Sequence, residues 1–387
     1  MGLTPFQLVL PARTIFGWGK VGEIGSEAKK LGKRALVVTG RSFLRTSGVL
    51  DQLVQALGEA GVEAVLFSQV EAEPSLATVE EGRTLLAEEG CDLVIGAGGG
   101  SGMDAAKAIA GLAREEGQVK DYFAGREITQ PGLPWIAVPT TAGTGAEATK
   151  NSVLSHYESR VKKSIRSDFW VADLVLWDPQ LSSHMPPELT AATGMDALTQ
   201  AIESYTSRWA NPFTDGLARR AISLIGRNIL LAYREGENRE AREGMALGCY
   251  LAGIALTNAR LGVVHGLAHP LGILYKLPHG LVCGVLLPYA MEYNLRAAKR
   301  KYADTAALMG LDTGGLTSQE AARLALKRVR ELNKKMGLPP GLGELGLKEE
   351  DFDFIIRETM PSGSTAANPR EVTAAGVRAI LKANLPG

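Results

Sequence analysis

The sequence predicts an α/β N-terminal domain with a parallel sheet, followed by an all-α C-terminal domain. Before about residue 185, short apolar runs alternate with segments of helix length, which is typical of βαβ units. After residue 185, long segments with helical periodicity follow one another without strand-like runs between them. The 387 residues are enough for two domains, whose limits we place at 1–185 and 186–387.

Composition and charge argue against several classes of protein. Lys+Arg and Asp+Glu are both 42, so the net charge is zero, and a nucleic-acid partner or an anionic membrane surface is not expected. The three cysteines form no CxxC pair, which argues against a disulfide framework or a zinc ribbon. No signal peptide and no run of 18 apolar residues is found, so we expect a cytoplasmic protein.

The first domain is expected to contain short buried strands, each an apolar run of the kind found in parallel sheets. Strands are predicted at residues 6–10, 35–39, 62–67, 92–96 and 135–138. Helices are predicted at 48–60, at 77–89 and from Met103 onward. The second domain is expected to be helical because its segments have helical periodicity; within residues 215–233, for example, apolar residues recur mostly every three to five positions. Its helices are predicted at 188–206, 213–233, 238–258, 261–275, 281–297, 300–309, 317–336 and 371–384.

Two loops at strand ends suggest a nucleotide site. Gly98, Gly99, Gly100 and Ser101 lie between the strand at 92–96 and the next helix, where glycine N–H groups and a helix N-terminus favour a pyrophosphate. The run does not satisfy GxGxxG. It also follows the third buried strand, at 92–96, rather than the first, at 35–39. Alone it is therefore weak evidence for nucleotide binding.

The second loop carries Thr140, Thr141 and Thr144 after the strand at 135–138. Their hydroxyls are suited to phosphate or ribose, although turns that cap the next helix would use the same residues. Two such loops at neighbouring strand ends together favour dinucleotide binding.

Three of the five histidines, His265, His269 and His279, lie within residues 262–288. His265 and His269 are four apart and share a helix face, while His279 follows a break at Pro278. Converging imidazoles indicate a metal or proton-transfer site. The alternative is three separately satisfied histidines around a helical hairpin.

An acidic residue suited to the same site lies on the first predicted helix of the second domain. Asp196 and Gln200 are one turn apart, and a carboxylate among apolar residues is costly unless it is paired or binds a metal. One carboxylate with two or three imidazoles suits Zn²⁺ or Fe²⁺. An Asp–His hydrogen bond between helices is the alternative.

The motifs GGGS, PTTAGTGAE, GMDALTQAIE, HGLAHPLG and PHG occur in this order, and the chain resembles the iron-containing (group III) alcohol dehydrogenases. The resemblance runs from Pro11 to Arg370, and the family is related in fold to glycerol dehydrogenase and dehydroquinate synthase. It implies a dinucleotide-binding domain, a helical metal domain and an active site in the cleft between them. It also implies a homo-oligomer, dimeric or larger.

The resemblance implies roles for individual residues. Asp196, His265 and His279 would bind the metal, Fe²⁺ or alternatively Zn²⁺, and His269 would lie near the nicotinamide and the substrate. The cofactor, NADP or NAD, would be lined by Gly98, Gly99, Gly100, Ser101, Thr140, Thr141, Thr149, Asn151, Lys162 and Leu181.

The chain departs from the family pattern in three places. Gln200 replaces a histidine ligand, and its amide oxygen would ligate the ion more weakly than imidazole or hold a metal-bound water. Gly40 replaces an acidic residue, so with Arg41 and Ser42 it would favour a 2′-phosphate and NADPH. Glu73 replaces an asparagine.

These residues together predict a metal-dependent oxidoreductase that transfers a hydride between NAD(P)H and a small alcohol/aldehyde pair. His269 would serve as the catalytic residue that relays the alcohol proton. Two alternatives are a dehydroquinate synthase-like lyase and an NAD(P)-binding homologue that has lost its metal. The lyase should need several basic residues for a phosphorylated substrate, whereas residues 262–288 contain only Lys276.

Overall fold

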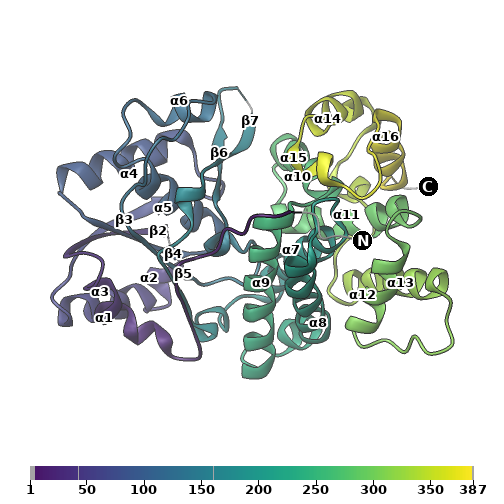
Figure 1. The fold of residues 1–387 in the computed structure, drawn as a ribbon, viewed down its shortest axis with the longest axis horizontal. Coiled ribbons are helices and arrows are strands. Elements are labelled where there is room, and N and C mark those ends of the chain that lie inside the picture. The colour runs from purple at the N-terminus through teal and green to yellow at the C-terminus, as the bar shows by residue number, and fades with distance from the viewer. Residues whose placement is uncertain (1–4, 42, 160, 386–387) are drawn as a thin grey trace. The chain divides into compact units, whose positions relative to one another are not determined.

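The computed structural model describes residues 5–41, 43–159 and 161–385. The chain divides into two compact units (Figure 1). Among the described residues, the α/β unit comprises 9–141 and 145–183, and the helical unit comprises 5–8, 142–144 and 184–385. The predicted fold class is confirmed, whereas the limits 1–185 and 186–387 stay a prediction.

The α/β unit is built on a six-stranded sheet with the order β1-β8-β5-β4-β2-β3, in which all neighbours are parallel. The strands are β1 (Thr14–Phe16), β2 (Arg34–Gly40), β3 (Glu63–Val70), β4 (Leu93–Gly98), β5 (Trp135–Pro139) and β8 (Leu174–Trp177). The strand order reverses between β2 and β4, because β3 lies on one side of β2 and all later strands lie on the other. In open α/β sheets, ligands bind at the carboxyl ends of the strands beside such a reversal.

Helices cover both faces of the sheet. They are α1 (Ile24–Ala28), α2 (Phe43–Thr46), α3 (Val49–Glu59), α4 (Leu76–Glu88), α5 (Gly100–Gly111) and α6 (Val119–Ala124). Leu93, Ile95 and Ala97 of β4 join a buried cluster with α1 and α3. On the other face, a Cβ at Gly96 would lie 2.7 Å from the Cβ of Ala106, so α5 packs directly on the strand. Burial on both faces explains why these strands are continuously apolar.

The strand predicted at residues 6–10 is wrong. The first strand is β1, whose Thr14, Ile15 and Phe16 pair with Val175, Leu176 and Trp177 of β8. Phe6 and Leu10 are instead exposed. An apolar run becomes a strand only where a neighbouring strand is available, and residues 6–10 have none among the described residues.

A two-stranded antiparallel hairpin, β6 (Asn151–His156) and β7 (Val161–Arg166), lies outside the main sheet. It is tied to the loop before α4, since the Ser155 amide donates to the Pro74 carbonyl (2.9 Å) and the Tyr157 hydroxyl donates to the Glu73 carbonyl (2.9 Å). The sequence prediction did not include this hairpin or β8.

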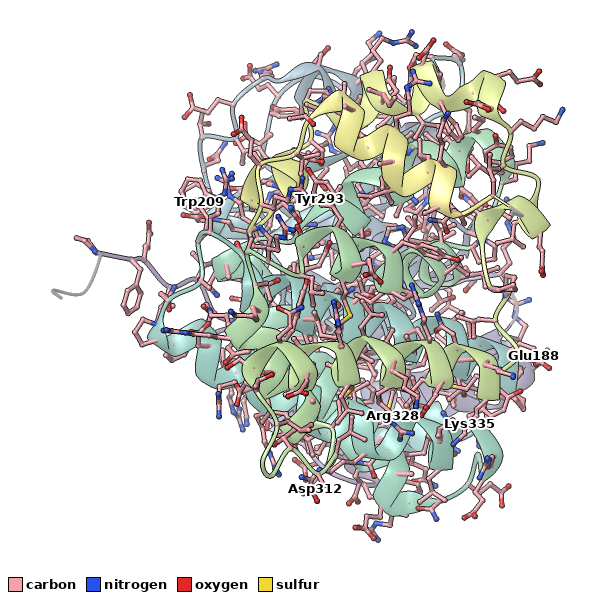
Figure 2. All side chains as sticks on the ribbon, turned by 90° about the vertical axis from the view of Figure 1, so that its right-hand side faces the viewer. Glu188, Trp209, Tyr293, Asp312, Arg328 and Lys335 are labelled. Carbon is pink, nitrogen blue, oxygen red and sulfur yellow. The ribbon has the colours of Figure 1, made fainter. Side chains whose placement is uncertain are left out.

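The helical unit contains α7 (Pro187–Thr206), α8 (Pro212–Arg234), α9 (Arg239–Ala259), α10 (Val263–Tyr275), α11 (His279–Asn294), α12 (Lys299–Leu308), α13 (Ser318–Lys335), α14 (Phe352–Thr359), α15 (Gly363–Ala367) and α16 (Ala374–Ala383). The eight predicted helices are confirmed, whereas α14 and α15 were not predicted. Amphipathicity decides which face is buried, and α13 buries Ala325, Val329 and Leu332 while Arg328 and Lys335 lie along its outer side (Figure 2).

Within the described chain, no single helix is long and apolar enough to span a membrane; α9 and α10 together reach the required length and composition, but the pair is bent by 103°.

Candidate metal centre and cofactor-binding loops

Helix α7 presents three polar side chains from one face. Asp196, Gln200 and Glu203 are spaced by four and three residues, so they line up along the helix. All three are buried. Because α7 packs against α8, α9 and α11, this polar face lies inside the unit and must find its partners there.

The partners come from α10 and α11. Pro278 precedes α11, whose first residue is His279, so the predicted break is confirmed. A Cβ at Gly280 would lie 2.5 Å from the carbonyl oxygen of Ala192 on α7, which means that only glycine permits this approach. The close contact brings the start of α11 beside Asp196.

Four side chains converge there. The ligand atoms of Asp196, His265, His279 and Cys283 all lie within 4.8 Å of one another. His265 Nε2 is 3.3 Å and His279 Nε2 is 3.9 Å from Asp196 Oδ1. Cys283 Sγ is 3.6 Å from His279 Nε2. The structure therefore brings together three of the four predicted metal residues and adds a cysteine.

Glu203 fixes the orientation of His265. Its carboxylate lies 2.7 Å from His265 Nδ1 and accepts the backbone N–H groups of Gly262 (2.9 Å) and Val264 (2.7 Å). Since a carboxylate only accepts, Nδ1 carries a proton, and Nε2, which faces Asp196, is the nitrogen left for a metal. A carboxylate that holds a histidine in this way is typical of metal sites.

The centre contains buried polar atoms that no described protein atom satisfies. Asp196 Oδ1, His265 Nε2 and Gln200 Oε1 have no hydrogen-bond partner among the described residues. The 3.3 Å pair of Asp196 and His265 has the distance of an ion pair without hydrogen-bond geometry. Unsatisfied atoms of this kind are costly unless a bound ion uses them. The donor set thus fits a divalent metal.

Gln200, the fourth predicted metal residue, is held by its amide nitrogen. Nε2 donates to the Thr144 carbonyl (3.2 Å), which leaves Oε1 as the end without a described partner. This orientation allows Oε1 to act as an oxygen donor.

The charges of the centre stabilise one another, because the Asp196 and Glu203 carboxylates favour positive charge beside them. Burial raises the pKa of Asp196, but the imidazoles of His279 and His265 outweigh it and hold the pKa below its ordinary value. Burial lowers the pKa of His265, but Cys283, Asp196 and Glu203 raise it well above its ordinary value. Burial raises the pKa of the Cys283 thiol to about 12.

His269, the predicted catalytic residue, lies beside this group but outside it. Its ring centroid is 5.7 Å from that of His279, and the ring is half-buried. A half-buried imidazole next to a ligand is suited to moving a proton between the site and solvent.

In the α/β unit, the predicted glycine loop lies beside the reversal of strand order. Gly98 ends β4 with φ of 144°, a backbone conformation that favours glycine. Gly99 precedes α5 without a side-chain cap, so the first N–H groups of this helix lack a capping side chain. The Thr140 amide donates to the Gly98 carbonyl (2.9 Å), and a Cβ at Gly99 would lie 3.2 Å from Thr141 Oγ1. The glycine and threonine loops are therefore neighbours.

Gly40 lies at the end of β2, the strand next to β4. A Cβ there would meet nothing closer than the Val70 carbonyl oxygen at 3.8 Å, so sterics do not require glycine. Arg41 is exposed, and its Nε donates to the Gln69 carbonyl (3.2 Å). Ser42, also predicted to bind the cofactor, lies outside the described residues.

A buried lysine holds the segment that follows the threonine loop. Lys107 Nζ donates to the Ala146 carbonyl (2.7 Å), Thr149 Oγ1 (2.8 Å) and the Asn151 carbonyl (2.8 Å). Burial lowers the pKa of Lys107 to about 8 and raises that of Asp104 to about 6. Two predicted cofactor residues, Thr149 and Asn151, are thus positioned by Lys107.

The remaining predicted cofactor residues have different surroundings. Lys162 Nζ lies 2.6 Å from a Glu73 carboxylate oxygen, so its charge is already paired. The Glu73 amide donates to Ser101 Oγ (3.1 Å), and Glu73 has φ of 63°, which is uncommon outside glycine. Leu181 belongs to the buried cluster of the α/β unit. Cofactor contacts of all these residues stay predictions.

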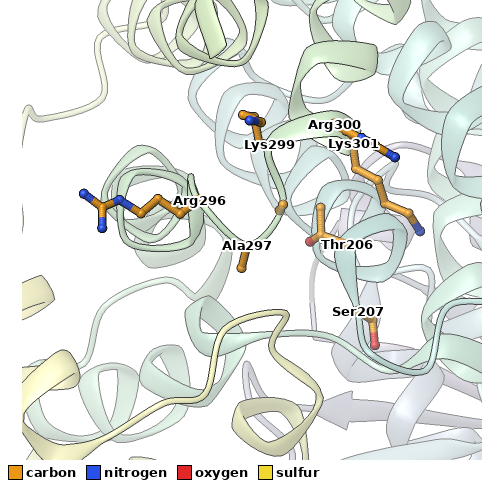
Figure 3. A pocket seen from close by; sticks show the side chains of 8 residues that line it. Thr206, Ser207, Arg296, Ala297, Lys299, Arg300 and Lys301 are labelled. Carbon is orange, nitrogen blue, oxygen red and sulfur yellow. The ribbon is translucent and has the colours of Figure 1, made fainter. Parts of the chain in front are cut away.

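A surface pocket of the helical unit is separate from this centre. It is lined by Thr206, Ser207, Arg296, Ala297, Ala298, Lys299, Arg300 and Lys301. Figure 3 shows Arg296, Lys299 and Lys301 pointing in different directions, and Lys301 is paired with Asp215 (2.8 Å). Because its charges do not converge, we assign it no role.

Sequence reasoning missed Cys283, Glu203 and Lys107. Cys283 lies four residues after His279, and Glu203 lies seven after Asp196, so both spacings place them on the faces that carry the metal residues. No such spacing relates Lys107 to a predicted site residue, so the sequence did not indicate its role.

Comparison with known proteins agrees over the whole chain. Family models described as iron-containing alcohol dehydrogenase and its C-terminal part match residues 11–179 and 190–385. The chain is 41% identical over 373 residues to a 1,3-propanediol dehydrogenase of Citrobacter freundii, covering 96% of both chains. It is 36% identical to an NAD-dependent methanol dehydrogenase of Bacillus methanolicus, covering 96% of this chain and 98% of the other. A crystal structure of a 1,3-propanediol oxidoreductase superposes with a TM-score of 0.95 at 41% identity, covering 99% of this chain and 100% of that one.

Proposed function

The chain belongs to the iron-containing alcohol dehydrogenase family and is an alcohol dehydrogenase/aldehyde reductase, and from this premise we propose how its own residues carry out the reaction. The family models that match describe alcohol dehydrogenases, which decides against the lyase alternative. The observation that carries the proposal is the buried group of Asp196, His265 and His279, because its unsatisfied ligand atoms fit a divalent metal.

Asp196, His265 and His279 would hold the metal, with Gln200 Oε1 as a further oxygen donor. When bound, the metal polarises the alcohol or aldehyde oxygen as a Lewis acid, and the nicotinamide exchanges the hydride. Glu203 keeps the proton of His265 on Nδ1, so that Nε2 stays available. This hydrogen bond also fixes the orientation of the His265 ring.

The α/β unit would bind the dinucleotide. Gly99 precedes α5, and Gly100 and Ser101 are its first two residues. Their N–H groups are suited to the pyrophosphate, which lies favourably at a helix N-terminus. Thr140 and Thr141 follow β5 beside them and offer hydroxyls. Gly40 leaves room at the adjacent strand end, so we propose that NADPH is accepted as well as NADH.

His269 would move the substrate proton. During oxidation, a ring nitrogen of His269 accepts the proton that leaves the alcohol hydroxyl and passes it towards solvent, and during reduction the proton returns by the same route. The half-buried position of the ring supports this role.

The substrates are proposed to be short-chain alcohols or diols and their aldehydes, because the relatives include a 1,3-propanediol dehydrogenase and a methanol dehydrogenase. The test is to strip the protein with a chelator, restore Fe²⁺ or Zn²⁺ separately, and follow nicotinamide absorbance with a panel of aldehydes and both cofactors. Metal-restored turnover is expected. Full turnover by the stripped protein would contradict the proposed metal site, and no turnover with any metal would indicate a homologue that has lost catalysis. The homo-oligomeric state and cytoplasmic location stay predictions.

A further inference from the structure

Cys283 is the part of the metal centre that the family pattern does not account for. Its side chain is fully buried, and its sulfur lies in the same group of ligand atoms as those of Asp196, His265 and His279. It extends from α11 one turn after His279, so both side chains reach the centre from one helix face.

Two of three known distances between these ligand atoms match those of a tetrahedral site. With a metal–sulfur bond of about 2.3 Å and metal–nitrogen or metal–oxygen bonds of about 2.0–2.1 Å, tetrahedral angles place sulfur and nitrogen about 3.6 Å apart and nitrogen and oxygen about 3.3 Å apart. The corresponding distances here are 3.6 Å from Cys283 Sγ to His279 Nε2 and 3.3 Å from His265 Nε2 to Asp196 Oδ1. The third edge, from His279 Nε2 to Asp196 Oδ1, is longer at 3.9 Å.

Two further atoms point to a ligand at the same place. Asp196 Oδ1 and His265 Nε2 belong to side chains that are more than nine-tenths buried, and neither has a described hydrogen-bond partner. The cysteine therefore does not stand alone, since it lies in one group with Asp196 Oδ1 and His265 Nε2, two buried atoms that have no described hydrogen-bond partner.

We propose that Cys283 binds the metal as a thiolate, which gives a donor set of one carboxylate, two imidazoles and one sulfur, and that this set selects zinc over iron. The inference rests on the proposed function for the existence of the metal site. Thiolate is a soft donor that suits Zn²⁺, and a coordinating thiol is deprotonated outright. The S–H bond breaks as the metal–sulfur bond forms, and the proton leaves to solvent.

A sulfur donor also explains how the centre tolerates Gln200. The neutral amide oxygen is a weaker donor than the imidazole that the family pattern has there, and Cys283 supplies a strong anionic donor in its place. Catalytic zinc centres sometimes expand to five ligands, so a fourth protein donor still leaves a position for substrate oxygen.

The first test replaces the metal with Co²⁺, whose bond to thiolate gives a sulfur-to-metal charge-transfer band in the near ultraviolet. We expect this band in the wild type, in Gln200→Ala and in the control Cys249→Ser, which alters a buried cysteine on α9 of the same unit. It should disappear in Cys283→Ser, which is close in size. A band that persists in Cys283→Ser, or is absent from cobalt-loaded wild type, would overturn the proposal.

The second test compares metal affinities by competition with a chelator. Cys283→Ser should weaken Zn²⁺ binding by more than the roughly 10–100-fold that loss of a ligand's hydrogen-bond partner costs. Fe²⁺ binding should change less, so the preference moves towards iron. Equal losses for both metals, or none, would contradict the proposed selection.

A third measurement needs no variant and so does not depend on how Cys283→Ser folds. X-ray absorption of the zinc-loaded wild type should show one sulfur at about 2.3 Å. A zinc coordination shell of only nitrogen and oxygen atoms would overturn the role of Cys283 while leaving the proposed function intact. A wild type that binds no metal yet transfers hydride would instead overturn the metal site itself.

Discussion

The three histidines of residues 262–288 differ in what their rings face. His265 and His279 direct Nε2 towards Asp196 Oδ1, whereas His269 approaches the ring of His279 from outside the group. This difference separates two roles that the sequence alone could assign only by resemblance.

We predict that His265→Ala and His279→Ala lose the metal and with it nearly all activity. His269→Ala should retain the metal and lose roughly 10²–10⁴-fold in turnover, the range of a general acid–base group. Metal content and turnover of the three purified variants check this. Loss of metal from His269→Ala would reverse the assignment.

Gln200→His is expected to tighten metal binding by about tenfold or more, because imidazole is a stronger donor than a neutral amide. The variant also gives up the hydrogen bond from Nε2 to the Thr144 carbonyl, so Gln200→Ala serves as the control for that loss. Metal titrations of all three proteins measure the effect. Identical affinities in all three would show that position 200 does not reach the ion.

The wild type should use NADPH at least as well as NADH, and Gly40→Asp should lower the kcat/KM for NADPH by at least about tenfold. Near a protein surface, a carboxylate ~4 Å from a phosphate costs several kcal/mol in repulsion. This exceeds the ~1.4 kcal/mol that a tenfold change in kcat/KM requires. The space at Gly40 admits the new side chain. The measurement is kcat/KM for NADPH and for NADH in the wild type and the variant. A strong NADH preference in the wild type would contradict the prediction.

At the residue scale, the sequence predicts Asp196, His265 and His279 as metal ligands but does not predict the cysteine that lies beside them. Asp196, His265 and His279 stand out because carboxylates and imidazoles are rare in apolar helices. Cys283 does not, since a buried cysteine usually behaves as a small apolar residue. Its proximity to His279 Nε2 became meaningful only when both rotamers were known.

Between elements, the approach of α11 to α7 determines whether the centre exists. Gly280→Ala places a methyl group 2.5 Å from the Ala192 carbonyl oxygen, and backbone cannot move aside cheaply. We expect destabilisation of about 1–3 kcal/mol and weaker metal binding, because His279 begins the displaced helix.

Gly216→Ala is the matched control for this change, because Gly216 is an exposed position inside α8 where an added Cβ meets nothing within 4 Å. It should be neutral or stabilise by up to about 1 kcal/mol, since alanine favours helices over glycine. Denaturant unfolding of the metal-free proteins measures both. Equal stability of Gly280→Ala and wild type would mean that the helices adjust more easily than the contact implies.

Elements with strong local signals were predictable, and those defined by distant partners were not. The helices of the second unit can be recognised from the helical periodicity of their apolar residues. By contrast, β1 is only three residues long and depends on β8. The hairpin of β6 and β7 is half polar, and its turn lacks a glycine signal, so pairing with a distant loop decides its place.

For the molecule as a whole, we predict that residues 1–185 retain nucleotide binding but transfer no hydride. The glycine loop, the threonine loop and the Lys107 contacts all precede residue 186, whereas Asp196, His265, His279 and Cys283 all follow it. Titration with NADPH and an aldehyde assay of the fragment provide the measurement. Turnover by the fragment would show that chemistry does not need the helical unit.

Lys107 has a consequence for how opening of the α/β unit can be observed. Its ammonium has no exposed surface and makes three hydrogen bonds, so amine-reactive reagents cannot reach it while the native packing persists. Exposed lysines such as Lys299 label at once by comparison. Peptide mapping after timed acetylation would therefore measure the rate at which Lys107 becomes modified. That rate reports how often residues 146–151, which Lys107 holds, detach from α5.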